Sequence, residues 1–199
     1  MSVLAKYVRD DHGAAAAEFA LIVPVMLVFL LGILDVGFYA WQINRAEKAT
    51  QMGARYAVVT EMVPNGLETY SFVLDGSTVQ GAAVSQTAFP GVACTSTACT
   101  CKAACSFTPG FDGTAFNNIA NRMRLFKSEI TNANVRIDYD WSGLGYAGDP
   151  NGPEVAPIVT VRLVSMQHRP LLSFLLGTVD LPDFAYSLTA EDSSGNVSN

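Results

Sequence analysis

The sequence predicts an α+β protein: a long N-terminal transmembrane helix followed by a small extracytoplasmic domain with an antiparallel sheet and one packed helix. Three observations predict this fold class. Residues 19–34 include no charged or strongly polar side chain. Residues 115–130 show helical apolar periodicity, and residues 135–141 alternate strictly between apolar and polar side chains. About 140 residues follow the first helix, which is enough for one modest core.

The long helix begins with its apolar part. Apolar side chains follow Phe19 with hardly a break as far as Trp41, so residues 19–41 reach the roughly 20 residues that cross a bilayer as a helix. The helical pattern then continues to about residue 60, which gives one helix over residues 14–60. Pro24 lies inside it and has no N–H to donate, so we expect the helix to kink or loosen there.

Two carboxylates interrupt this apolar stretch. Glu18 lies at its beginning, and a carboxylate on a membrane helix costs on the order of 2.5–3.5 kcal/mol, so we expect it to have a partner. Asp35 has two interpretations. It is a solvated residue at the outer membrane interface, which the closeness of Trp41 favours, or it is a second buried pairing site in an assembly.

The residues around Glu18 resemble a known processing signal. A short leader ends in Gly13, a small residue follows, Glu18 is the fifth residue beyond the glycine, and an apolar helix comes next. This order is similar to the class III signal of type IV pilin-like proteins. Together with Leu-Gly-Ile-Leu-Asp-Val-Gly at residues 31–37 and Gly-Ala-Arg-Tyr-Ala at residues 53–57, it resembles the TadE-like pseudopilins over residues 12–60. Those proteins are minor pilins of the tight-adherence (Tad or Flp) pilus.

The resemblance implies a structural protein that is needed to assemble a pilus used in surface adherence. It implies that a prepilin peptidase cuts between Gly13 and Ala14, which makes residues 1–13 the leader. The implied partners are this peptidase, other pilin and pseudopilin subunits, the Tad assembly machinery and lipid of the inner membrane. The resemblance gives assembly roles to three side chains of the helix: Glu18, Phe19 and Asp35. Asp35 stands where the family more often has Glu.

The expected location is the bacterial inner membrane. The chain would cross it once, with a cytoplasmic N-terminus and residues 61–199 as a periplasmic domain that could also enter an extracellular pilus. Lysine and arginine are balanced on the two sides of the span and do not fix the orientation. The clustered cysteines do, because they suit an oxidising compartment. The alternative function is an uncleaved bitopic protein whose periplasmic domain binds a ligand or partner.

All four cysteines lie in residues 94–105. A bond between Cys99 and Cys101 would close a tiny strained ring, so two arrangements remain. One joins Cys94 to Cys99 and Cys101 to Cys105, and the other joins Cys94 to Cys101 and Cys99 to Cys105. Zinc sites usually separate two cysteine pairs by a spacer, which is missing here. We therefore expect disulfides that staple a loop, and no metal.

The domain is expected to contain a sheet of at least three strands. Residues 135–141, 158–166 and 184–190 supply them, and the second of these is apolar on nearly both faces and therefore central. The helix over residues 115–130 would pack on the sheet. Residues 70–74 read as one more short strand.

Nothing in the sequence indicates catalysis or a cofactor. His168 is the only histidine beyond the leader, and it is interpreted as a solvated loop residue. There is no G-x-S-x-G sequence and no glycine-rich phosphate loop. Asp138 and Asp140 read as the solvated face of one strand. The net charge of −6, without a basic run, excludes nucleic acid as a partner.

Residues 171–176 are very apolar but too few to span a membrane, so they form a turn in the core or a patch that meets a partner or the bilayer surface.

Overall fold

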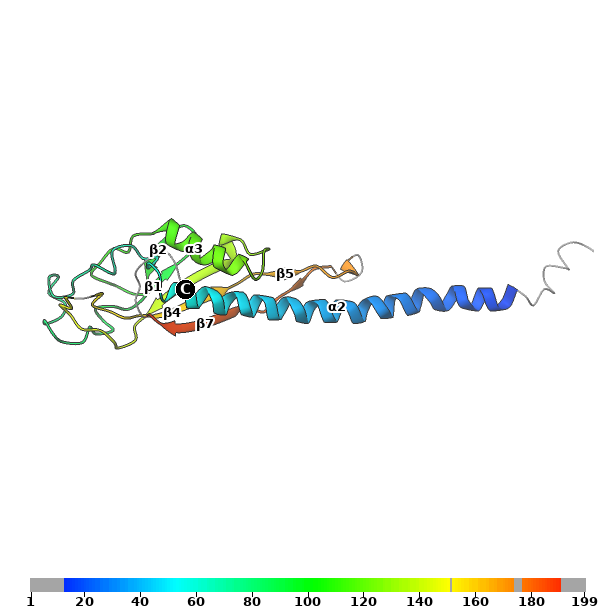
Figure 1. The fold of residues 1–199 in the computed structure, drawn as a ribbon, viewed down its shortest axis with the longest axis horizontal. Helices are drawn as coiled ribbons and strands as arrows, with labels where there is room; N and C mark the ends of the chain where they lie inside the picture. Colours follow the sequence, from blue (N-terminus) through cyan, green and yellow to red (C-terminus); the bar gives the residue numbers. More distant parts are fainter. Residues whose placement is uncertain (1–12, 151, 174–176, 191–199) are drawn as a thin grey trace, which may run out of the picture. The chain divides into compact units, whose positions relative to one another are not determined.

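The computed structural model describes residues 13–150, 152–173 and 177–190. The chain is α+β, as the sequence predicts, and forms two compact units (Figure 1). One unit contains the first helix as far as Gln42 together with residues 167–179, and the other contains residues 43–166 and the chain from residue 180 on. Except for Gly13, the expected leader lies outside the described residues.

The first helix, α2, spans Ala14–Ala57 without a break. Its 44 residues give it a length of about 66 Å at 1.5 Å per residue. It continues through Pro24, so the proline does not interrupt it. It ends three residues earlier than predicted, where the Thr60 hydroxyl donates to the carbonyl oxygen of Tyr56 at 2.8 Å and Pro64 follows.

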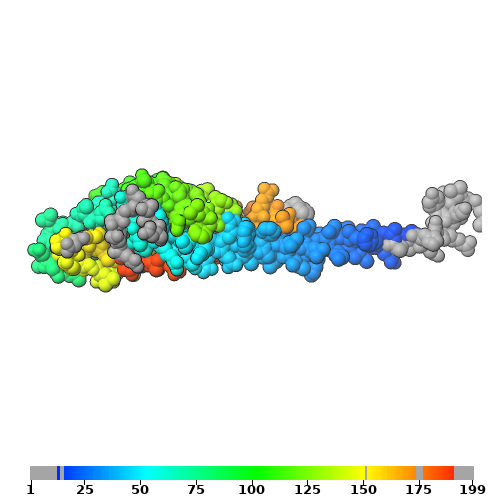
Figure 2. Space-filling view, in the orientation of Figure 1, coloured from blue at the N-terminus to red at the C-terminus, as the bar shows by residue number. Residues whose placement is uncertain are grey.

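In the first unit, most side chains of α2 are apolar and nevertheless exposed, and Figure 2 shows this part of the helix at the molecular surface. Residues 167–173 pack against one face of it. This segment begins with the short strand β5, Gln167–His168, which pairs with β6, Val179–Asp180.

The second unit is built on a five-stranded sheet with the order β2-β1-β3-β4-β7, in which all neighbours are antiparallel. β4 pairs over its whole length with β3 on one side and β7 on the other, so it is an inner strand, as its apolar sequence predicts. The strands are β1 (Val92–Cys94), β2 (Cys99–Cys101), β3 (Val135–Asp140), β4 (Ile158–Leu163) and β7 (Phe184–Thr189).

The core of the second unit forms where two helices meet the sheet. α3, Gly113–Arg124, buries Phe116, Ile119 and Met123. A Cβ atom placed on Gly53 of α2 would lie 2.7 Å from the Met123 side chain and 3.3 Å from that of Val161 in β4. The glycine therefore allows a close approach of α2 to α3 and the sheet.

α3 is shorter than the predicted helix over residues 115–130. It begins at a cap, because the Asp112 carboxylate accepts the N–H groups of Thr114 and Ala115 at 2.7 and 2.9 Å. Beyond Arg124 the chain turns, and the guanidinium of this residue donates to the carbonyl oxygen of Ile130 at 2.9 Å. Ile130 remains buried, so the apolar pattern marked the core correctly although the helix had ended.

Residues 70–74 form turns, so the short strand predicted there is wrong. Phe72 is fully buried, but its N–H donates to the buried carboxylate of Glu154 at 2.8 Å. A side chain from a distant loop thus replaces the neighbouring strand that a β-ladder would need.

Candidate functional site

The residues expected at the cleavage site lie at the beginning of α2. Gly13 is exposed and directly precedes the helix, whose first residue is Ala14. Glu18 comes one turn later and is also exposed, and the described part of the chain gives it no ion pair. Phe19 next to it is 70 % exposed. Since charged and apolar side chains lie together on a bare helix, this end of the protein requires a partner or a membrane around it.

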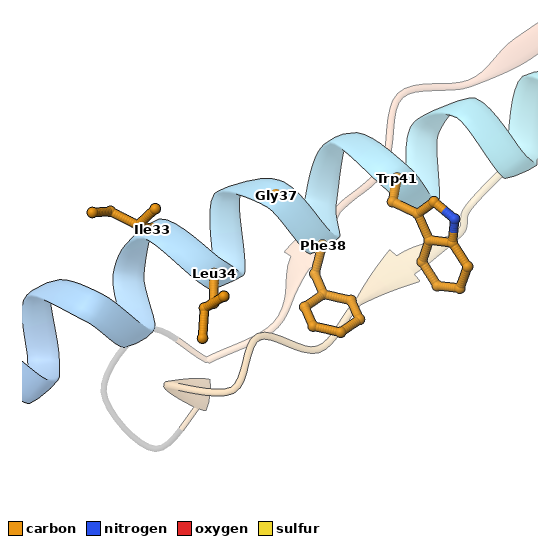
Figure 3. Close-up of a pocket in the computed structure, with 5 residues that line it drawn as sticks. All are labelled: Ile33, Leu34, Gly37, Phe38 and Trp41. Carbon is orange, nitrogen blue, oxygen red and sulfur yellow. The ribbon is translucent and has the colours of Figure 1, made fainter.

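The surface of α2 as far as Trp41 is almost entirely apolar. The helix is long and apolar enough to cross a membrane, and very little of its most apolar window is buried. Five residues line an open groove of about 340 Å³ along it: Ile33, Leu34, Gly37, Phe38 and Trp41. Leu34 and Phe38 project from the same side of the helix (Figure 3). Such a surface is stable only in lipid or against other apolar helices. The helix is thus consistent with anchoring by a single membrane pass.

Among residues 16–41 of α2, Asp35 is the only buried residue, with 7 % of its surface exposed. Its Oδ1 accepts the N–H of Leu171 at 2.6 Å, and its Oδ2 accepts the N–H of Leu172 at 3.0 Å. The favoured interpretation of Asp35 as a solvated interface residue is therefore wrong. The carboxylate is paired within its own chain, a contact for which the sequence held no direct signal, because its partners are backbone groups 136 and 137 residues away.

A second contact joins residues 167–179 to α2. The ring of His168 meets that of Tyr39 edge-on, with 5.8 Å between the centroids. His168 is buried, so its interpretation as a solvated loop residue is wrong. Asp35 and Tyr39 are four residues apart and so lie on one face of the helix, whereas the five residues that line the groove are exposed. One face of α2 is covered by its own chain, and the groove face is bare.

The cysteine loop contains two disulfides. Cys94 is bonded to Cys99, and Cys101 to Cys105, which is one of the two arrangements that the spacing left open. Cys94 and Cys99 are also opposite each other in the antiparallel pair of β1 and β2. The first bridge therefore closes a hairpin, and the second fixes the chain that follows it.

The paired carboxylates of β3 belong to a network of ion pairs. Asp138 lies 2.7 Å from the guanidinium Nε of Arg162 in β4 and 3.5 Å from Nζ of Lys102. Asp140 lies 2.6 Å from the same lysine nitrogen. Lys102 thus fastens the loop after β2 to β3, and Arg162 joins β4 to β3. Cations here neutralise both acids, so the arrangement suits packing rather than acid–base chemistry.

Buried ionisable groups in the second unit are structural as well. Burial raises the pKa of the Tyr139 hydroxyl, whose oxygen accepts the N–H of Val63 at 3.0 Å. Burial also lowers the pKa of Lys127, against the opposing effect of Glu129. Neither residue borders the groove of α2. Within the described ranges, no three histidine, cysteine, aspartate or glutamate side chains come together as a metal site.

Comparison with known families gives one finding. Residues 13–55 match the family model of TadE-like protein. The match begins at Gly13 and covers nearly all of α2, including Glu18 and Asp35. A search of the curated proteins and a search of the solved structures found no match.

Proposed function

We propose that this chain, which carries the TadE-like sequence over residues 13–55, is a minor pilin of a tight-adherence pilus. The family links the chain to the Tad pilus and to structural rather than enzymatic proteins. The finer proposal is that a prepilin peptidase removes residues 1–13 and that the mature subunit joins other pilin-type subunits through α2. The observation that carries it is the exposed Glu18 on a bare apolar helix, five residues beyond an exposed glycine.

Cleavage after Gly13 would give the chain a second charge at the same end. The new α-amine of Ala14 is a cation, and Glu18 lies four residues further, about 6 Å along the helix axis. In a bilayer both charges are costly unless they are paired. The amine of a neighbouring subunit, or of the same one, can neutralise the carboxylate, and such a pair is stronger in a low-dielectric setting than in water. Gly13 thus serves the peptidase, and Glu18 serves docking into the assembly.

The remaining parts of the proposal concern location. The first helix anchors the precursor in the inner membrane with its N-terminus in the cytoplasm, and the disulfide-bonded second unit lies in the periplasm. The groove face of α2 is the one available to other subunits, because residues 168–172 cover the face that contains Asp35.

The test compares two variants with a matched control in cells that have an active prepilin peptidase. Gly13→Val should leave the full-length precursor in the inner membrane, whereas Glu18→Ala should still be cut but should no longer co-purify with partner pilins. Glu47→Ala changes an exposed glutamate on the same helix and should be cut and assembled normally. Immunoblots for loss of the leader and pull-downs of pilins measure these outcomes. If the wild-type protein keeps its leader in these cells, the proposal fails, and the uncleaved bitopic binder takes its place.

A further inference from the structure

The contact between Asp35 and residues 171–172 has a consequence for how the protein meets the membrane. Asp35 is the only acidic residue of α2 between Glu18 and Glu47. Both of its oxygens accept backbone N–H groups, from Leu171 and Leu172. The carboxylate therefore holds a turn of the chain directly against the apolar part of the helix.

The depth of this contact follows from the geometry of the helix. From Phe19 to Asp35 there are 16 residues, or about 24 Å at 1.5 Å per residue. The hydrocarbon core of a bilayer is about 30 Å thick. With Phe19 at one edge of the core, Asp35 lies inside the opposite leaflet, and the turn that it holds lies at the same depth. Trp41, about 9 Å further, falls at the interface.

Non-helical backbone is tolerated at this depth only where its polar groups are satisfied. The N–H groups of residues 171–173 and 177 meet this requirement. Asp35 accepts two of its N–H groups, Pro170 has none to satisfy, and the N–H of Ser173 donates to the carbonyl oxygen of Pro170 at 3.0 Å. The N–H of Gly177 in turn donates to the carbonyl oxygen of Ser173 at 2.8 Å. The carboxylate gives the N–H groups of the turn an acceptor, and these N–H groups give the carboxylate its partners, so neither is left unpaired in an apolar environment.

The outer side of the turn is suited to lipid. Leu172 points inward and is buried, but Leu171 is 54 % exposed and Val179 is partly exposed. Leu171 adjoins α2, because its N–H donates to Asp35. The exposed Arg169 shares a pocket with Ser173 and Thr178, where a cation can meet the phosphate of a lipid headgroup while its stem remains in apolar surroundings.

We propose that residues 167–173 and 177–179 form a bilayer-contacting element that Asp35 holds against α2 in the outer leaflet. The occupant of its exposed side is phospholipid. The protein thus enters the membrane at two places, through the helix and through this element, which lies more than 120 residues later in the sequence. The proposal does not depend on pilus assembly, since the same element would be present in an uncleaved membrane protein.

The test uses the full-length chain in phosphatidylcholine–phosphatidylglycerol vesicles. Leu171→Cys introduces a thiol for an environment-sensitive fluorophore, and the four native cysteines do not compete because all are in disulfides. Lipids with a nitroxide on the acyl chain should quench most of the fluorescence at position 171. Leu74→Cys is the matched control, because Leu74 is a leucine that is 90 % exposed and belongs to the second unit. A label there should keep its fluorescence.

Variants of Asp35 test whether this carboxylate holds the element against α2. In the Leu171→Cys background, Asp35→Ala should abolish most of the quenching, while Asp35→Glu should retain it because a carboxylate is still present. Glu47→Ala should change nothing. Near-ultraviolet circular dichroism checks that the second unit remains folded in each variant. An unquenched label in the wild-type background would overturn the bilayer contact. Equal quenching with and without Asp35 would show that this carboxylate does not hold the element in the bilayer. Quenching of a label at position 74 as well would show that contact with lipid is not confined to the element.

Discussion

The two halves of α2 share one continuous backbone and yet bury opposite kinds of side chain. Before Gln42 most apolar side chains are exposed, and among residues 16–41 the one with the least exposed surface is the acidic Asp35. After Gln42 polar residues become frequent, and the buried stripe consists of small side chains: Ala46, Ala49, Gly53, Ala54 and Ala57. Hydrophobicity therefore does not tell which face of this helix packs within its own chain. In the first half, hydrophobic side chains indicate that the helix is surrounded by an apolar medium. In the second half, small side chains indicate the face that packs within the chain.

The largest effect that this comparison predicts comes from one substitution made in both halves. Gly53→Ala places a methyl group 2.7 Å from Cγ of Met123, so it should lower the free energy of unfolding by about 1–3 kcal/mol. Gly37→Ala meets no atom within 4 Å and should be neutral or stabilise α2 by up to about 1 kcal/mol through helix propensity. Urea unfolding of the full-length protein in detergent, followed by near-ultraviolet circular dichroism, measures both.

A double variant shows whether the cost at Gly53 arises from this contact. Met123→Ala removes the atoms that the new methyl group would meet, so Gly53→Ala should cost much less in that background than in the wild type. If Gly53→Ala is harmless in the wild type, or if its cost is unchanged without Met123, the close approach of α2 and α3 is not what requires a glycine.

Much of this fold could be predicted because local patterns and tertiary environment agree. The strands β3 and β4 and the helix α3 each carry an apolar face of the correct period, and each meets another such face. The failed strand at residues 70–74 had equally good local signals. It nevertheless pairs with no strand of the sheet, and the contact between the Phe72 N–H and Glu154 that takes the place of pairing spans 82 residues.

The candidate site also has one part that the sequence could reveal and one part that it could not. Gly13, Glu18 and the apolar span are contiguous in sequence, so a motif could identify them, and the family match begins at that glycine. The partners of Asp35 could not be found in this way, because every residue except proline supplies a backbone N–H and the side chains of Leu171 and Leu172 carry no sign of the contact. The only available signal was the carboxylate itself, which is costly in an apolar helix without a partner.

A smaller effect is expected where the helix first meets the second unit through a charged side chain. The guanidinium of Arg45 donates to the carbonyl oxygen of Phe126 at 2.8 Å and lies 3.5 Å from Glu129. Arg45→Met keeps most of the aliphatic length but removes both contacts. It should cost about 1–2 kcal/mol, because a hydrogen bond from a charged group is lost in a partly exposed setting.

The control for Arg45 is a nearby cation on the exposed face. Lys48→Met should change the free energy of unfolding by no more than about 0.5 kcal/mol, since Lys48 is exposed. Both values come from the same urea unfolding experiment. Equal costs at the two positions would mean that the contact with Phe126 contributes nothing beyond the general effect of removing a positive charge from α2.

The smallest effect is predicted for the buried polar residue that needs no partner outside the helix. Thr50 is almost completely buried, but its hydroxyl donates to the carbonyl oxygen of Ala46 one turn earlier, at 2.9 Å. Thr50→Val removes this donor and leaves no group unpaired, because that carbonyl still accepts the N–H of residue 50 within the helix. The change in unfolding free energy should stay within about 0.5 kcal/mol.

Asp35→Val makes the opposite case, since it leaves two N–H groups of the turn without an acceptor in an apolar environment. Thermal unfolding of both variants in the same nanodiscs compares them directly. If Thr50→Val lowers stability as much as Asp35→Val, a polar group satisfied within α2 would not differ from one that depends on a distant segment.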